Sequence, residues 1–194
     1  MFYDIIEKTF RKGFVLFMEK KITFRLFPSE KQKKLFDINF QCTRIVYNYF
    51  SELVKNDKEI GVELSEWDYD KYLPPLKKSN DFAFLKEPDS KTLQGAINKL
   101  FKDMGIARRF KKDVYPVYKL RKNQKNFYRV LQDWTREKAI FLCAYGLKLP
   151  KVGVVQLNQK CYIPPSWKIS GADIYQTYTD KYYAKITFDC VDDE

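Results

Sequence analysis

The chain has 194 residues, of which 45% are hydrophobic and 17% aromatic. Such a chain can bury a core, which excludes global disorder and favours one domain or two small ones. The formal net charge of +11 indicates a polyanionic partner, with nucleic acid expected before an anionic membrane. No apolar run approaches the length of a membrane span and no signal peptide is evident. We therefore expect a cytoplasmic protein that does not bind membranes.

The first half of the chain begins with an expected N-terminal arm or helix over residues 1–19, where apolar residues recur at roughly helical spacing. Residues 21–27 then alternate polar and apolar side chains, as a half-buried strand does. Ser29 and Gln32 match a capping box. The apolar stripe that follows predicts a helix of about 25 residues, ending near Asn56.

The middle of the chain is expected to hold short helices at 65–73 and 76–80, followed by a longer helix capped by Ser90 that continues through Arg108 and Arg109. After about residue 114, short apolar runs separated by Pro and Gly predict an antiparallel sheet of about five strands. These runs cover residues 140–145, 147–149, 152–157, 161–163 and 182–188.

This order of elements predicts an α+β fold. The expected architecture is a small antiparallel β-barrel, similar to an oligonucleotide-binding fold, made from residues 20–28 and 114–194. A helical domain over residues 29–113 would be inserted after the first strand of that barrel.

The positive charge is concentrated between residues 108 and 138, which contain eleven basic and three acidic residues. The basic residues are Arg108, Arg109, Lys111, Lys112, Lys119, Arg121, Lys122, Lys125, Arg129, Arg136 and Lys138. Six aromatic residues are interleaved with them: Phe110, Tyr115, Tyr118, Phe127, Tyr128 and Trp134. Cations neutralise phosphates and flat rings stack on bases, so the pattern favours nucleic-acid binding over a merely solvated face.

Familiar catalytic and metal sites find little support. The chain has no histidine, which excludes Ser-His and Cys-His nucleophilic pairs and common zinc patterns. No Gly-rich phosphate loop occurs, and the four cysteines form no Cys-x-x-Cys pair, so we expect free thiols in a reducing compartment. The acidic C-terminal end is interpreted as solvated chain rather than a metal site. We predict no catalytic residue, no metal and no cofactor.

Several short segments, in order, resemble the N-terminal half of TnpB, the transposon-encoded RNA-guided nuclease family from which type V CRISPR effectors derive. The closest local match is Cys42–Asn48, preceded by Arg25–Pro28 with Gln32 and Leu35. The other matching segments are residues 73–78, 84–94, 115–119, 147–153 and 182–186.

The resemblance implies a β-barrel wedge domain with an inserted helical recognition domain, which in the family hold guide RNA and the RNA–DNA heteroduplex. The RuvC-like nuclease half of the family would begin after residue 190 and is absent from this sequence. Combined with the charge pattern, the resemblance gives a set of predicted nucleic-acid contacts. These are Arg44, Asn48, Arg108, Arg109, Lys111, Lys112, Tyr118, Lys119, Arg121, Lys122, Lys125 and Tyr128.

Three functions stay open at this point. The leading hypothesis is a nuclease-less relative that binds guide RNA, another structured RNA or a heteroduplex with target DNA, and that regulates or inhibits a full-length type V effector. The second is the N-terminal half of a split or truncated nuclease, with the nuclease carried on a separate chain. The third is a protein-interaction module that binds an effector directly.

Overall fold

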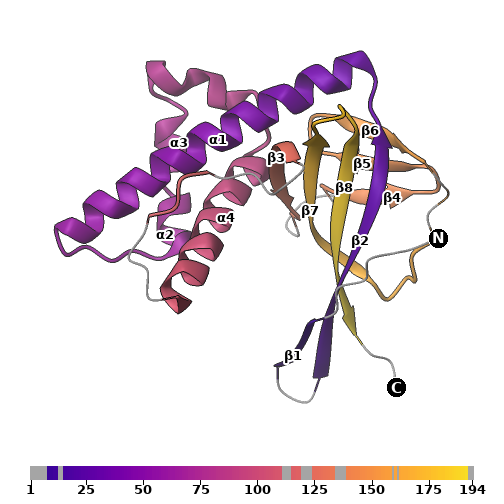
Figure 1. Ribbon diagram of the computed structural model, residues 1–194, viewed down its shortest axis with the longest axis horizontal. Helices are drawn as coiled ribbons and strands as arrows, with labels where there is room; N and C mark the ends of the chain where they lie inside the picture. The colour runs from indigo at the N-terminus through magenta and orange to yellow at the C-terminus, as the bar shows by residue number, and fades with distance from the viewer. Residues whose placement is uncertain are drawn as a thin grey trace.

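The computed structural model describes residues 8–12, 15–110, 115–118, 124–133, 139–158, 160 and 162–191. An antiparallel sheet stands beside a layer of helices (Figure 1), which confirms the α+β class. The strands are β1 (Lys8–Lys12), β2 (Val15–Phe27), β3 (Gln124–Leu131), β4 (Phe141–Cys143), β5 (Gly146–Leu149), β6 (Gly153–Leu157), β7 (Lys168–Thr177) and β8 (Tyr182–Val191). Their order in the sheet is β3-β7-β8-β2-β6-β5-β4, and β1 pairs with β2.

The sheet is not the closed barrel that the sequence predicts, because its end strands β3 and β4 do not pair with each other. The first helix of the layer, α1 (Glu30–Glu59), covers the interior instead. Phe36 and Phe40 of α1 are buried in the core of the sheet, and the Phe40 ring meets the Tyr128 ring of β3 edge-on at 5.4 Å. A helix therefore supplies apolar surface where strand pairing would otherwise close the barrel.

Of the arm or helix expected over residues 1–19, the helix is wrong where the structure describes the chain, because residues 8–12 and 15–19 lie in β1 and β2. Residues Phe17 and Glu19 of β2 pair with Val191 and Asp189 of β8. Backbone hydrogen bonds to a distant strand determine the conformation here, and they override the local helical spacing of apolar residues. The strand predicted for residues 161–163 is also not found: Tyr162 and Ile163 are irregular, and Cys161 lies outside the described residues.

The helical layer begins as predicted, with Ser29 and Gln32 forming the capping box of α1. The remaining helices are α2 (Glu66–Asp70), α3 (Leu73–Leu76), the 3-10 helix η1 (Asn80–Lys86) and α4 (Ser90–Arg109). The N-cap of α4 is Asp89 rather than Ser90: its carboxylate accepts from the Lys91 amide. A second apolar core fills the space between α1 and α4 and contains Tyr47, Phe50, Leu93, Ile97 and Leu100.

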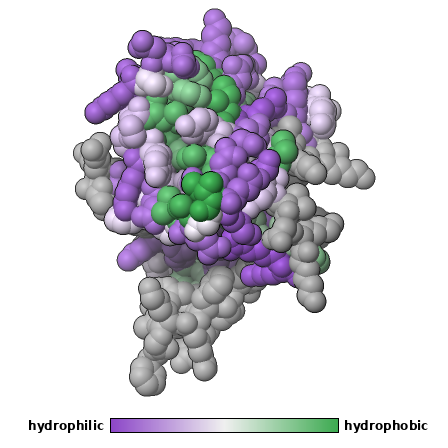
Figure 2. All heavy atoms as spheres, turned by 90° about the vertical axis from the view of Figure 1, so that its left-hand side faces the viewer, coloured by the Kyte–Doolittle hydropathy of each residue, from purple (hydrophilic) through white to green (hydrophobic). Residues whose placement is uncertain are grey.

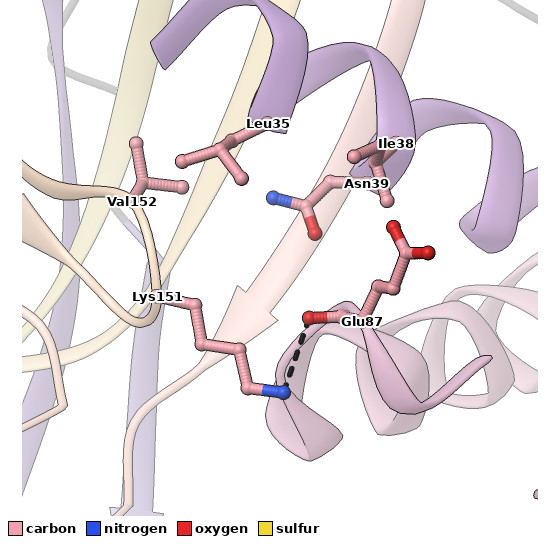
Figure 3. Close-up of a pocket in the computed structure, with 6 residues that line it drawn as sticks. All are labelled: Leu35, Ile38, Asn39, Glu87, Lys151 and Val152. Atoms are coloured by element: carbon pink, nitrogen blue, oxygen red, sulfur yellow. Dashed lines mark hydrogen bonds between the residues drawn. The ribbon is translucent and has the colours of Figure 1, made fainter. Parts of the chain in front are cut away.

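A clasp in the β5–β6 turn joins the sheet to the helices. Lys151, which adopts a positive φ of 58° at this turn, donates from Nζ to the carbonyls of Lys86 (2.8 Å), Glu87 (3.1 Å) and Pro88 (3.1 Å). From the other side, the Gln32 side chain donates to the Val154 carbonyl at 2.8 Å. The residues of this junction surround a pocket of about 310 Å³ (Figure 3). Because the ammonium of Lys151 is committed to main-chain carbonyls, the pocket presents no free cation from its six lining residues.

The end of α2 carries a poorly solvated carboxyl group, Asp70. Its Oδ1 is buried without a hydrogen-bond partner among the described residues. Burial and, secondly, the charge of Glu66 raise the pKa of Asp70 to about 6. An aspartate in the unfolded chain titrates near ~3.9. The native state therefore binds this proton more readily, so Asp70 favours folding below about pH 4, and this contribution is lost as the pH rises through 6.

We expect Asp70→Asn to raise the free energy of unfolding at pH 7.5 by about 1 kcal/mol, and to change it little at pH 4. Urea denaturation at the two pH values measures both. Asp68→Asn in the same helix is the matched control, for which the free energy of unfolding at pH 7.5 should change in the opposite direction. Hydrogen bonds from Lys71 and Ser65 lower the pKa of Asp68 to about 2, so its loss should destabilise the protein at pH 7.5. Destabilisation by Asp70→Asn at pH 7.5 would contradict this account.

Candidate nucleic-acid interface

A short segment, residues 115–118, straps the helical layer to the edge of the sheet. Its two ends are held by α1: Ser51 Oγ donates to the Pro116 carbonyl at 2.9 Å, and the Tyr118 amide donates to Asn48 Oδ1 at 3.0 Å. The Tyr118 hydroxyl donates to the carbonyl of Phe127 in β3. This segment, called the strap below, lies in the middle of the basic stretch that the sequence identifies. The fold therefore fixes this segment against one side of α1.

Aromatic rings and charges pack closely beneath the strap. Tyr47 meets Tyr118 edge-on at 5.2 Å and donates its hydroxyl to Asp103 at 2.8 Å. Lys99 also pairs with Asp103, at 2.6 Å, and lies 5.7 to 5.9 Å from the ring centroids of Tyr47, Tyr118 and Phe127. Burial and the Asp103 carboxylate raise the pKa of Tyr47, and burial raises that of Tyr118. Both hydroxyls stay protonated and the cluster holds the strap rigidly.

The strap brings three of the predicted contacts together. Arg44 is exposed on α1, four residues before Asn48, and is close enough to Tyr118 for its charge to act on the phenol. No hydrogen bond or ion pair of Arg44 is found among the residues that the structure describes. The amide oxygen of Asn48 holds Tyr118, so Asn48 positions the strap. Arg44 is then the side chain at this place that remains available to a phosphate.

Three other predicted contacts lie elsewhere. Arg108 and Arg109 are exposed in the last turn of α4. Arg108 also lines a pocket of about 360 Å³ with Lys58, Glu63 and Glu66, where charges of both signs meet. Lys125 of β3 pairs with Asp180 at 3.0 Å. Five predicted contacts lie outside the described residues: Lys111, Lys112, Lys119, Arg121 and Lys122.

The prediction for Tyr128 as a stacking residue is wrong. Its side chain is only 1% exposed and packs against Phe36 and Phe40. Residues of a strand point alternately to the two faces, and Tyr128 lies on the face that carries the core. Its neighbours Phe127 and Arg129 point the other way.

Strands β3 and β7 are not among the predicted strands, so the outer face of the sheet to which they contribute is not predicted either. On that face Tyr175 of β7 and Tyr183 of β8 are opposite each other, and Tyr183 is opposite Arg25 of β2. The signal was present in the alternation of buried Ala172 and Ile174 with Asp173 and Tyr175. A charged residue and a glycine in this run hide it from a search for apolar stretches.

On the helical side of the molecule, Figure 2 shows hydrophobic side chains gathered amid a largely hydrophilic surface. The large apolar side chains that the helical layer exposes include Ile60 (75%), Trp67 (69%) and Ile106 (53%). In the described part of the chain, no helix is long and apolar enough to cross a membrane, and no group of three potential metal ligands is found.

The fold and the strap together define an α+β protein with an arginine-bearing surface where a long helix meets the sheet. Residues 18–55 match the family model of the helix-turn-helix domain of IS605 OrfB, so this N-terminal part is similar to the corresponding domain of TnpB proteins. The match runs from Met18 in β2 to Lys55 in α1, and thus includes Arg44 and Asn48. A comparison with curated proteins gives no match.

The matched segment does not itself form a helix-turn-helix. All of residues 18–55 are described, and they form a strand followed by the single continuous helix α1. A recognition helix placed in a major groove by a preceding helix is therefore not available from these residues. The matched range covers most of β2, the capping box and α1 as far as Lys55.

Proposed function

We propose that this protein binds nucleic acid through Arg44 and the basic stretch of residues 108–138, which contains the strap. The observation that carries the proposal is this juxtaposition: Ser51 donates a hydrogen bond to the strap, Asn48 accepts one from it, and Arg44 lies exposed next to it. The family match over the same part of α1 supports the proposal. Lysine and arginine contacts to phosphates supply most of the affinity in such a complex.

The ligand we propose is a guide RNA or another structured RNA, alone or paired with target DNA. The protein would act without an active site of its own, and would regulate or inhibit a full-length effector of the TnpB and type V class by occupying its RNA. The resemblance of ordered segments along the chain supports this ligand. Sequencing of RNA that copurifies with the protein would identify it.

Binding is tested by fluorescence polarisation with a labelled RNA stem-loop at several salt concentrations. We expect the logarithm of affinity to fall linearly with the logarithm of salt, and Arg44→Gln to reduce the magnitude of the slope by about one. The combined change of Lys119, Arg121 and Lys122 to glutamine should reduce it by about three. Lys31→Gln is the matched control, since Lys31 is exposed on another side of the same helix.

Absence of binding at micromolar protein, or binding that does not respond to salt, would refute the proposal. Equal slopes for Arg44→Gln and Lys31→Gln would remove Arg44 from the interface. The exposed apolar side chains of the helical layer favour a second candidate, a protein-interaction module. An effector that is captured equally before and after RNase treatment would support that candidate.

A further inference from the structure

The outer face of the sheet carries a row of aromatic and basic side chains that the function above does not use. Register places Phe127, Tyr175, Tyr183 and Arg25 directly opposite one another on β3, β7, β8 and β2. Directly paired residues point to the same side of a sheet. That side is the outer one, because the neighbouring residues Phe24, Leu26, Ile174 and Ala184 are buried in the core. With strands about 4.8 Å apart, the row spans about 14 Å.

One pair within this row, and a second pair formed by Arg25 with a neighbour on β2, are already ordered. The rings of Tyr175 and Tyr183 are stacked, with centroids 5.3 Å apart and planes 15° from parallel. The Arg25 guanidinium lies 4.9 Å from the centroid of the Phe27 ring, which is 44% exposed. A preformed ring stack and a guanidinium held over an aromatic ring lose little conformational freedom when a ligand binds.

Helix α4 borders this face of the sheet along one edge. Gly95 of α4 packs directly on the main chain of Arg129 in β3, at one edge of the face. In Figure 1 no helix lies over β7, β8 and β2 on the side toward the viewer, and α4 stands beside them. Lys102 projects from α4 near Arg129, and burial together with that guanidinium lowers its pKa. The outer face of the sheet is thus open, and α4 stands along one side of it.

The charges on this face are positive near the tyrosine stack. Arg25 and Lys185 lie beside it on β2 and β8, and Asp173, which is directly opposite Lys185, is paired with Arg129 at 2.6 Å. At the far end of the same face, acids alternate with lysines: Lys168 is opposite Asp189, which is opposite Glu19. A polyanion is therefore attracted to the half that holds the rings.

The row is continuous with the strap surface. Phe127, its first member, lies under Tyr118, whose hydroxyl bonds to the Phe127 carbonyl. Phe127 itself is only 8% exposed beneath the strap, so the accessible track leads from Arg44 on α1, over Tyr118, to Tyr175, Tyr183 and Arg25.

We propose that an unpaired stretch of nucleic acid binds along this track, with a base extending the Tyr175–Tyr183 stack and phosphates near Arg25 and Lys185. The proposal rests on the nucleic-acid function above and names the form of its ligand. A partner that is both polyanionic and rich in flat rings fits such a face, whereas the bases of a duplex are already stacked on one another.

The experiment measures binding of a labelled twelve-nucleotide oligouridine and of a twelve-base-pair RNA duplex by fluorescence polarisation. The wild-type protein is expected to bind oligouridine more tightly than the duplex. Tyr183→Leu and Arg25→Gln should each weaken oligouridine binding five- to tenfold, and Lys168→Gln, on the same face beside Asp189, less than twofold. The proposal would be overturned by tighter binding of the duplex than of oligouridine, or by equal affinities of all variants. It would also be overturned if heparin, but not excess unlabelled oligouridine, displaced the labelled oligouridine.

A second measurement needs no substitution and so does not depend on variant folding. Ultraviolet crosslinking of oligouridine to the wild-type protein should join it to the peptides that carry Tyr175 or Tyr183. Crosslinks confined to other peptides would overturn the track. The two proposals fail separately: a protein that binds no RNA refutes both, whereas one that responds to Arg44→Gln but not to Tyr183→Leu or Arg25→Gln refutes the track alone.

Discussion

Replacing Gly95 with alanine is expected to destabilise the protein by about 2 kcal/mol or more, although alanine is the better helix former. A Cβ at this position would lie 2.2 Å from the carbonyl oxygen of Arg129 and 2.9 Å from its carbonyl carbon. Both atoms belong to the main chain of β3, so the helix and the strand must separate to relieve the contact. The gain of about 1 kcal/mol in helix propensity offsets only part of this cost.

Gly105→Ala on the same helix is the control, because nothing lies within 4 Å of the Cβ it would add. It should stabilise the protein by about 0.5 to 1 kcal/mol. Urea denaturation with an unchanged dependence on denaturant would measure both. If the two glycines gave the same sign, α4 and β3 could not be in direct main-chain contact.

Replacing Asp173 with alanine is expected to cost about 3 kcal/mol. Arg129 donates to the two carboxylate oxygens of Asp173 at 2.6 and 2.8 Å, across the β3–β7 pair, and Asp173 is 7% exposed. Arg129 also reaches Asn98 of α4 at 3.4 Å. Removal of the carboxylate leaves a largely buried guanidinium without its counter-charge, which is far more costly than the loss of an exposed pair.

The exposed pair of Lys125 on β3 and Asp180 in the β7–β8 turn provides the comparison, and Lys125→Gln should cost less than about 0.5 kcal/mol. Changing both members of the buried pair, as Arg129→Met with Asp173→Leu, should restore most of the stability lost in Asp173→Ala, since no lone charge remains buried. Thermal and urea unfolding of the four proteins decide between these outcomes. Equal losses for Asp173→Ala and Lys125→Gln would show that the Arg129 site is solvated.

Local sequence patterns predicted the helices better than the sheet. The capping box at Ser29 and the long apolar stripe after it identify α1, because both signals lie within a few turns of the same helix. Strand β7 was not predicted because Gly171 and Asp173 interrupt its apolar pattern. Both residues are explained by contacts with β3: Gly171 passes close to the Val130 carbonyl, and Asp173 pairs with Arg129. These contacts cannot be predicted from the sequence of β7 alone, because they form only when β7 pairs with β3.

The residues of the candidate site were likewise predicted only in part. Charge density identified the region of the strap, and the family motif identified Arg44 and Asn48. Composition could not separate rings that face outward from rings in the core, so Tyr128 was assigned to the ligand while Tyr175 and Tyr183 were overlooked. The alternation of a strand decides between neighbours such as Phe127 and Tyr128, and that alternation depends on where β3 begins.

The pairing of β2 with β8 constrains how this protein can be made. Residues 17–26 of one strand meet residues 182–191 of the other. While the ribosome is still producing the intervening chain, the core between α1 and α4 can already form, but β2 has no neighbour on its β8 side. A chain interrupted before Tyr182 would therefore present two open strand edges, β2 and β7, and such edges pair readily with other molecules. Incomplete chains should accumulate as aggregates rather than as a smaller folded protein.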